Sequence, residues 1–501
     1  MFSVENHEEK DAGNDPDANS KIEATLNSIV ENQNLQNDIS VEIVKIIQKL
    51  VGDQRASLDK IDALEELIKT EREAISAKVQ KVADESISNY VAHLGILKQT
   101  SNLILRQTRR PRKKIRCVFL VHSIPMWDAL ADVYAAMTQD DRFDPIVVSL
   151  NSTPLGRGKY TGEQQVSEFL YSQKIAHLRF DMVDSYQGLD VLKNLLPDVI
   201  FRQQQWDTPL PPAFHTHELT FARICVIPYG TNVLSSFSGT IQTEISPLAF
   251  DQAYHRAAWK IFCETELTRS FYQSFHHCDP AKLHLSGYPK LSSLEKAKGK
   301  GQWPLREPNG RAFRVIWAPH YSLGSGGPGF GVFNIIYKDM LDWAKQHQDI
   351  QFVLKPHPAL FNGVLTADDV QFFKKMWLSL PNCAIEEQQY GELFDASDMM
   401  VTDGVSFLTE YHLFKKPLVF FDSGHHVPFN TLGKLAEACA HKVSSFKEMK
   451  RAVIGYKNGE QWKKAEEVER LLDVLIPQDK NPAASILDTI SDSIDEEEMG
   501  N

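Results

Sequence analysis

Residues 399–423, MMVTDGVSFLTEYHLFKKPLVFFDS, carry the strand, turn and helix signals around which the rest of the chain can be ordered. An apolar strand ends at Thr402, a helix is expected to begin near Ser406, and a second apolar strand follows at 418–421. In parallel α/β sheets, a loop that leaves a strand and enters a helix is a common site for anionic ligands. The stretch therefore predicts a doubly wound α/β fold.

Hydroxyl and carboxylate groups in this stretch are suitably spaced for a nucleotide diphosphate. Thr402, Ser406 and the first N–H groups of the expected helix can donate to phosphate oxygens. Glu410 follows Ser406 by one helical turn on the same face, within reach of a ribose hydroxyl. Helix capping also selects Ser, Thr and Asp, so a strand, capped helix and strand without any ligand is the alternative.

Two upstream loops are expected at the same edge of the sheet. The sequence WAPHYS (317–322) contains His320, and the sequence LKPHP (354–358) contains Lys355 and His357. Each follows an apolar strand, and the carboxyl ends of parallel strands share one edge of a sheet. Imidazoles, a lysine and hydroxyls in one place suit a diphosphate, because they stabilise the charge that builds on a leaving phosphate.

Size and composition restrict the class of protein. The chain has 501 residues, of which 42% are hydrophobic and 24% charged, which predicts a globular protein of two or three domains. The net charge of -12 argues against a general nucleic-acid-binding protein. The polar N-terminus predicts no signal peptide, and no apolar run approaches the ~20 residues needed to cross a bilayer. We expect a cytoplasmic protein whose six cysteines stay reduced: Cys117, Cys225, Cys263, Cys278, Cys383 and Cys439.

The order of strand and helix signals divides the chain into five parts. Strand and helix patterns alternate twice, on either side of a Gly-, Pro- and Lys-rich segment at 296–311, which predicts two successive doubly wound domains with a cleft between them. The expected parts are a disordered 1–18, a helical region 19–108, an acceptor domain 115–295, a nucleotide-donor domain 312–478 and an acidic, loose tail 479–501.

The region 19–108 has the apolar spacing of a long helix or a helical hairpin. Ile61, Ile68, Ile75 and Val82 recur every seven residues, which predicts a coiled coil in part. We expect self-association through these helices, with packing onto the chain's own body as the alternative. The segment that follows, RQTRRPRKKIR from Arg106 to Arg116, predicts an exposed hinge. Its charge also suits contact with an anionic membrane surface, which would place the protein at the inner face of the cytoplasmic membrane.

Three motifs together resemble a known family. WAPHYS, LKPHP and the stretch SDMMVTDGVSFLTEYHLFKKP, preceded by SGYPK, are similar to the CDP-glycerol glycerophosphotransferase family of teichoic-acid and capsule polymerases over about residues 220–440. The resemblance implies a GT-B fold of two Rossmann-like domains facing a cleft. It also implies that His357 and the loop with Thr402, Asp403 and Ser406 hold the donor diphosphate, that Glu410 holds the ribose, and that His320 faces the cleft.

The chain departs from that family where the acceptor would be activated. The family carries His-Gly-Thr at the end of a first-domain strand, but the matching place here is Tyr229-Gly230-Thr231. A tyrosine of ordinary pKa is a poor base at neutral pH. His122 and Asp207 are therefore alternative catalytic candidates beside Tyr229. No metal or other cofactor is expected, because no metal-ligating cluster is evident and Asp181-Met182-Val183-Asp184 is not the DxD that metal-dependent sugar transferases use.

Three functions remain open at this point. The first is a transferase that moves a glycerophosphate or glycosyl group from a nucleotide-activated donor to a hydroxyl of a cell-surface polysaccharide. The second is a hydrolysing nucleotide-sugar 2-epimerase, which would need no acceptor. The third is a non-catalytic scaffold with a transferase-like body, to which the tyrosine in place of histidine points.

Overall fold

The computed structural model describes residues 16–107, 113–153, 158–238, 241–307, 310–324, 327–361, 365–387, 390–476 and 481–499. Contacts divide the chain into two units, with the division between His93 and Leu94. The two units are described separately below. Of the residues expected to be disordered, 1–15 lie outside the described part of the chain, and helix α1 begins at Pro16.

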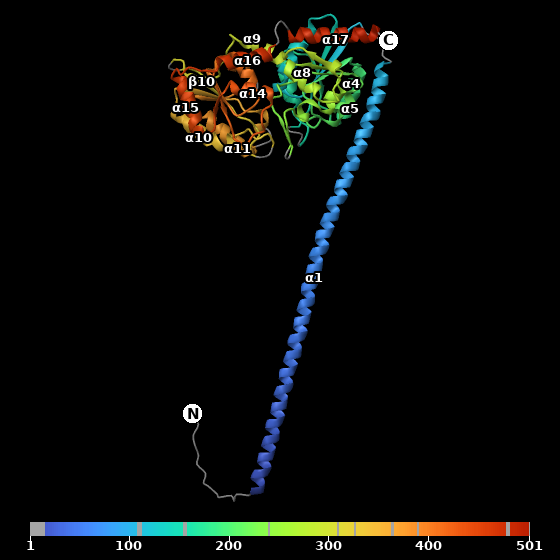
Figure 1. Cartoon of the computed structure of the whole chain (residues 1–501), viewed down its shortest axis with the longest axis vertical. Coiled ribbons are helices and arrows are strands. Elements are labelled where there is room, and N and C mark those ends of the chain that lie inside the picture. Colours follow the sequence, from blue (N-terminus) through green and yellow to red (C-terminus); the bar gives the residue numbers. More distant parts are fainter. Residues whose placement is uncertain are drawn as a thin grey trace. The chain divides into compact units, whose positions relative to one another are not determined.

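The helical region is one continuous α-helix, α1, which spans Pro16–Gln107 (Figure 1, blue). The hairpin alternative is therefore wrong. From Leu26 to Val82 the large apolar side chains of α1 are 50 to 64% exposed. The coiled coil stays a prediction. In the second unit, the last turns of α1 are tied to the body by Asn102, which donates to Thr220 Oγ1 at 3.1 Å, and by an ion pair from Lys98 to Glu218.

The first domain of the body is built on a seven-stranded, all-parallel sheet. Its order is β3-β2-β1-β4-β5-β8-β9, in which the first five strands follow the Rossmann order. Apolar runs such as 117–121, buried on both faces, produce these central strands. The strands are β1 Ile115–Val121, β2 Phe143–Leu150, β3 His177–Phe180, β4 Val199–Arg202, β5 Arg223–Val226, β8 Lys260–Cys263 and β9 Leu283–Leu285; β6 Ser236–Ser238 and β7 Ile241–Thr243 form a separate hairpin.

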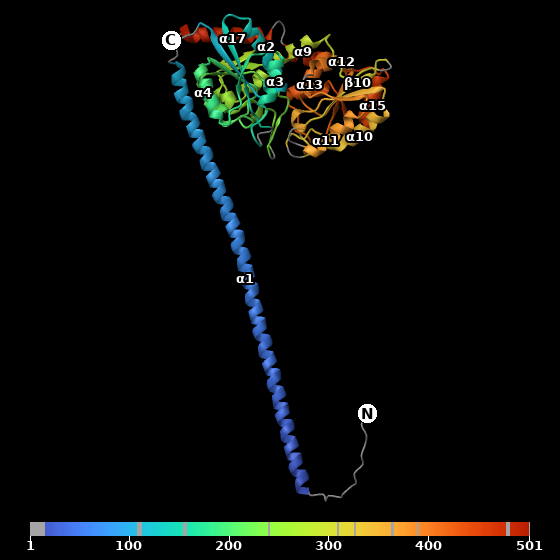
Figure 2. The ribbon, with the colours of Figure 1, turned by 180° about the vertical axis from the view of Figure 1, so that it is seen from behind.

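Helices connect these strands and cover the sheet (Figures 1 and 2). The last of them, α9, leads into the second domain, and its Leu291 and Leu294 pack into that domain's core. The helices are α2 Ile124–Thr138, α3 Glu163–Ser172, α4 Ser185–Leu195, α5 Thr216–Leu219, α6 Pro247–Phe250, α7 Ala253–Ala257, α8 Glu266–Gln273 and α9 Pro289–Ala297, with short 3₁₀ turns η2 Pro212–Phe214 and η3 Pro280–Lys282.

The second domain repeats the same pattern with six parallel strands. Its order, β12-β11-β10-β13-β14-β15, is again the Rossmann order, so two doubly wound domains are confirmed. The strands are β10 Phe313–Ala318, β11 Ile350–Leu354, β12 Cys383–Ile385, β13 Met399–Thr402, β14 Leu418–Phe421 and β15 His441–Val443. The helices are α10 Phe333–Gln346, α11 Ala367–Leu378, α12 Gly391–Ala396, α13 Phe407–Glu410, α14 Thr431–Ala438, α15 Phe446–Lys457 and α16 Ala465–Leu475, with the 3₁₀ turn η5 Tyr411–Phe414.

The sequence predicted a loose acidic tail for residues 479–501, but the structure shows a helix there. Residues Pro482–Met499 form helix α17, which lies beside α2 of the first domain (Figures 1 and 2, red). Ile486, Ile490 and Ile494 recur every four residues and are buried in the first domain's core. The acidic side of the helix also contacts the first domain, where Arg223 donates to Glu497 at 2.6 Å. The chain thus returns to its first domain at the end.

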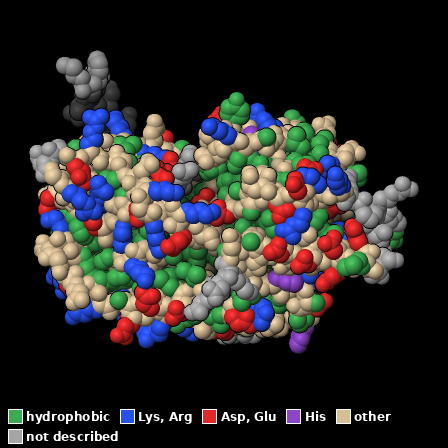
Figure 3. Space-filling model, turned by 90° about the horizontal axis from the view of Figure 1, so that it is seen from above, with side chains coloured by type: hydrophobic (Ala, Val, Ile, Leu, Met, Phe, Trp, Pro, Cys, Tyr) green, Lys and Arg blue, Asp and Glu red, His purple; other side chains and the backbone are tan. Residues whose placement is uncertain are grey.

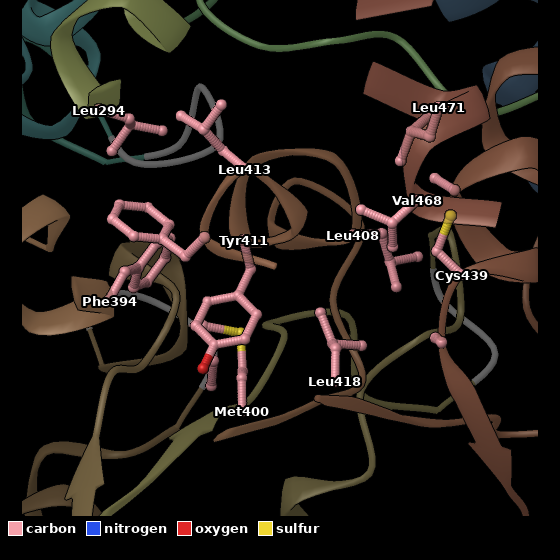
Figure 4. Close-up of a cluster of buried hydrophobic side chains, with 14 of the residues drawn as sticks. Leu294, Phe394, Met400, Leu408, Tyr411, Leu413, Leu418, Cys439, Val468 and Leu471 are labelled. Carbon is pink, nitrogen blue, oxygen red and sulfur yellow. The ribbon is translucent and has the colours of Figure 1, made fainter. Parts of the chain in front are cut away.

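Within residues 399–423, a short helix packs on a dense apolar core. Tyr411, Leu408, Met400 and Leu418 gather between this helix and the strands below it (Figure 4). The buried Tyr411 hydroxyl lies 2.8 Å from Ser397 Oγ, which ties the turn to the segment before β13. The expected amphipathic helix from Ser406 is only the four residues of α13, followed by η5.

Acidic and basic side chains are interspersed on the face of the molecule in Figure 3. Among the described residues, none of the helices combines the length and the apolar character that a membrane span requires.

Candidate active site

A cavity of about 540 Å³ lies between the two Rossmann-like domains. It opens at the carboxyl ends of β1 and β10, next to the points where the strand order of each sheet reverses. Its first-domain wall includes His122, Ser123, Met126, Thr153, Gln204, Trp206 and Tyr229; its second-domain wall includes Lys290, His320, Lys355, His357, Tyr390, Thr402 and Ser406.

Two histidines on the second-domain wall, the buried His320 and the half-buried His357, are held as neutral hydrogen-bond donors. His357 Nδ1 accepts from the backbone N–H of Ala359 at 3.1 Å, so a neutral ring carries its proton on Nε2. His320 Nδ1 lies 2.7 Å from Ser322 Oγ, and because that hydroxyl accepts from Phe330 N–H it is free to donate to the ring. Burial lowers the pKa of His357 to about 4, helped by Lys355, and lowers the pKa of His320 well below its ordinary value.

Two lysines supply positive charge to the same wall. Lys355 follows β11 and is buried, and burial lowers the pKa of its ammonium to about 8. Lys290, from α9, lies with Lys355 over the ring of Tyr390, with ammonium-to-centroid distances of 5.2 and 5.6 Å. An anion bound beside such a lysine is strongly stabilised, because it offsets the free-energy cost of burying the ammonium charge.

Asp403 lies behind the cavity wall and does not line it. Its two carboxylate oxygens accept the backbone N–H groups of His320 and Val332, each at 2.6 Å. The neighbouring Thr402 donates its hydroxyl to Ala318 O at 2.8 Å. These bonds join the loops after β10 and β13, so Asp403 and Thr402 fix the place of His320. Burial raises the pKa of Asp403 to about 7.

Glu410 is also withdrawn from the cavity. Its Oε1 lies 3.0 Å from Lys290 Nζ, in the position of an ion pair, and its Oε2 accepts from the Tyr390 hydroxyl at 2.9 Å. Its carboxylate is thus engaged by groups that do line the cavity. Ser406 lines the cavity and is exposed there, but it begins a helix of only four residues, so the expected contribution of a long helix N-terminus is absent from this wall.

The three acceptor-side candidates differ in their placement. His122 lines the cavity, and its Nε2 has no hydrogen-bond partner among the described residues. Burial and Arg202 lower the pKa of His122 to about 3, so its ring is neutral at neutral pH and is a weaker base than an ordinary imidazole. Tyr229 also lines the cavity, and burial raises the pKa of its phenol. Asp207 does not line it, because its Oδ1 accepts from Arg202 at 2.6 Å and from the Thr216 hydroxyl at 2.7 Å.

Sequence reasoning missed Lys290, Tyr390 and Gln204 as cavity residues. Lys290 could have been found, since it ends the motif SGYPK that carries part of the resemblance. Tyr390 and Gln204 belong to no motif, and only the folded chain brings them to the cavity. Within the described ranges, no three His, Cys, Asp or Glu side chains are grouped so that they would hold a metal ion.

Residues 243–486 match the model of the family described as CDP-Glycerol:Poly(glycerophosphate) glycerophosphotransferase. Among curated proteins, no sequence matches the chain. A provisionally assigned UDP-N-acetylglucosamine 2-epimerase from Listeria monocytogenes has a similar fold, with a TM-score of 0.50, 13% identity, and coverage of 76% of this chain and 97% of that one.

The wall teichoic acid polymerase TagF, in a substituted form soaked with CDPG, is similar to the same degree. Its TM-score is 0.50 at 14% identity, with coverage of 80% of this chain and 94% of that chain. At these identities the two structures show a shared fold, and together with the two Rossmann-like sheets they confirm the GT-B architecture. The family match includes three of the loops that line the cavity. Residues 243–486 therefore resemble the CDP-glycerol:poly(glycerophosphate) glycerophosphotransferase family over just under half of the chain, and the protein is a GT-B-type transferase.

Proposed function

We propose that the protein transfers a glycerophosphate or glycosyl group from a nucleotide-activated donor to a hydroxyl of a cell-surface polysaccharide. One observation carries the proposal. Two neutral imidazoles and two lysines line one wall of a cavity whose other wall belongs to a second Rossmann-like domain. A CDP-glycerol-like donor or a nucleotide sugar would place its diphosphate against His320, His357 and Lys355. There the N–H groups and the charge stabilise the leaving phosphate.

On the acceptor side we assign the role of general base to His122. Burial holds the phenol of Tyr229 protonated, and Asp207 is occupied by Arg202. With a CDP-glycerol-like donor, the acceptor oxygen forms a bond to the phosphorus that bears the glycerol, and its proton passes to His122 Nε2. The bond from that phosphorus to the bridging oxygen breaks, and the departing nucleoside monophosphate keeps the electron pair. With a nucleotide sugar, the acceptor oxygen instead forms a bond to the anomeric carbon and its proton passes to His122 Nε2, while the bond from that carbon to the diphosphate oxygen breaks and the nucleoside diphosphate leaves with the electron pair.

Calorimetric titration of the full chain with CDP, UDP, GDP and CMP tests the donor half. We expect one of these nucleotides to bind, and His357→Ala to remove most of that binding. His425→Ala is the matched control, because His425 is exposed in the same domain and does not line the cavity. His122→Ala should spare binding and remove turnover. If none of the four nucleotides binds, the transferase and the epimerase both fail.

The 2-epimerase remains the second candidate, since the similar fold of the Listeria monocytogenes protein extends over most of both chains. An epimerase would convert a nucleotide sugar into its 2-epimer without any acceptor. Incubation with UDP-N-acetylglucosamine alone, followed by NMR of the sugar, separates the two. If the protein is a non-catalytic scaffold, no nucleotide-activated donor is turned over either with or without an acceptor.

The regions outside the GT-B body support two further proposals. We propose that α1 assembles into a homo-oligomeric coiled coil through Ile61, Ile68, Ile75 and Val82, which are all exposed on the helix. Ile61→Asp with Ile68→Asp should lower the mass measured by analytical ultracentrifugation.

We also propose that the protein is cytoplasmic and contacts the inner membrane face through Arg106–Arg116, a segment of which residues 108–112 lie outside the described part of the chain. Salt-sensitive binding to anionic vesicles tests this proposal.

A further inference from the structure

The two walls of the cavity differ in charge. The second-domain wall carries Lys355, and Lys290 from the connecting helix α9 lies against the same wall, where it contacts Glu410 and the ring of Tyr390. Among the described residues, the first-domain wall carries no Lys, Arg, Asp or Glu, and its histidine is neutral because burial and Arg202 lower the pKa of His122 to about 3. Arg202, which acts on His122, is itself paired with Asp207 at 2.6 Å. Among the residues that the structure describes, the first-domain wall thus offers no cation to a phosphate.

The same wall instead presents hydrogen-bonding groups without partners. His122 Nε2, Thr153 Oγ1 and Gln204 Nε2 are buried, line the cavity and have no hydrogen-bond partner among the described residues. A buried polar atom without a partner is costly, so a ligand that supplies hydroxyls to all three recovers that cost. Imidazole nitrogen, hydroxyl and amide N–H form a mixed set of acceptor and donors, which suits the alternating hydroxyls of a sugar.

An aromatic side chain completes this wall. Trp206 lines the cavity, and its position is fixed because Nε1 donates to Leu248 O at 3.2 Å and the ring meets Tyr229 edge-on with centroids 6.1 Å apart. Met126 and Pro209 add apolar surface beside it. A flat aromatic surface next to hydroxyl partners binds the apolar face of a pyranose ring, whereas a linear polyol phosphate has no such face.

We propose that the reacting end of the acceptor is an uncharged sugar residue, held by Trp206, Gln204 and Thr153, and not the end of a poly(glycerophosphate) chain. This inference rests on the proposed transfer reaction and goes further by naming the acceptor class. It places the phosphate-rich part of the reaction wholly on the second-domain wall, where the lysines lie.

Saturation-transfer NMR on the full chain with saturating CDP tests the proposal. The probes are p-nitrophenyl glycosides of glucose, galactose and N-acetylglucosamine, and a synthetic glycerophosphate trimer. We expect sugar-ring signals from at least one glycoside, with an affinity that does not change when salt is raised. Trp206→Ala and Gln204→Leu should each weaken that glycoside roughly tenfold or more. Tyr171→Ala, an exposed aromatic residue of the same domain, is the matched control and should change nothing.

CDP binding is measured first, so that the two proposals can fail separately. Absence of CDP binding, with no other nucleotide in its place, overturns the proposed function itself. If CDP binds, a trimer that binds as well as or better than every glycoside overturns the acceptor assignment, and so does a complex that binds none of the glycosides. An affinity for glycosides that Trp206→Ala and Gln204→Leu leave intact also overturns it, because the sugar then lies elsewhere.

Discussion

Replacing Glu410 by glutamine tests whether this side chain binds the ribose of the donor or balances the charge of Lys290. In the structure, the Glu410 carboxylate lies 3.0 Å from Lys290 Nζ and accepts from Tyr390, and the Glu410 and Lys290 side chains are 1 and 8% exposed. Glu410→Gln keeps the shape and a partner for Tyr390 but leaves the buried ammonium without its counter-charge. Breaking a buried pair from one side costs about 3 kcal/mol at the lower end of the usual range.

Urea denaturation of the full chain measures that loss as a lower midpoint. Glu469→Gln is the matched control, because Glu469 pairs with Lys415 on the surface, with both side chains more than half exposed, and should cost less than about 1 kcal/mol. The double variant Glu410→Gln with Lys290→Met should recover part of the stability, since no charge is then left buried.

The same variant should not weaken nucleotide binding. Freed from Glu410, the Lys290 ammonium adds uncompensated positive charge to the cavity, so the affinity for CDP should stay the same or rise, most clearly at low salt. A tenfold loss of CDP affinity with an unchanged urea midpoint would refute this reasoning and assign Glu410 to the ribose.

Three further predictions concern separate parts of the body. His357→Ala should weaken CDP roughly 10- to 100-fold in calorimetry, while His357→Gln, which keeps an N–H donor, should lose less; equal losses would contradict the donor role. His412 is fully buried, and burial lowers the pKa of its ring to about 3. Because the unfolded chain takes up a proton near pH 6.5 and the folded chain does not, the free energy of unfolding that His412 contributes is present above pH 6.5 and is lost as the pH falls toward 3. Between pH 7 and pH 5 the free energy of unfolding, measured by urea titration, should fall by about 2 kcal/mol less in His412→Leu than in the original protein. An unchanged pH dependence would contradict this. Ile490→Ala in α17 should cost about 2 to 4 kcal/mol, against almost nothing for the exposed Asp492→Ala, and a negligible cost would show that α17 does not stabilise the first domain.

The sequence was sufficient to find the loops that form the second-domain wall of the cavity. His320, Lys355 and His357 each follow a strand that is recognisable as an apolar run, and parallel strands bring their carboxyl ends together whatever the details of packing. The two domains followed from the same alternation of strands and helices. Such features depend on local pattern, which a single sequence contains.

Roles set by tertiary contacts could not be predicted in this way. Asp403 and Glu410 have the residue types of ligands, but their carboxylates are turned to backbone N–H groups and to Lys290, which come from distant segments. The charge of residues 479–501 suggested a loose tail because the acidic residues concealed the four-residue spacing of Ile486, Ile490 and Ile494. That spacing was a usable signal for a packed helix.

The most direct test of the central claim is a structure of the full chain with CDP. The account predicts that the diphosphate lies on the second-domain wall, within hydrogen-bond distance of His357 Nε2 and His320 Nε2 and beside the Lys355 ammonium, with the first-domain wall left free for an acceptor. CDP bound outside this cavity, or bound with its diphosphate against His122 and Gln204, would contradict the account.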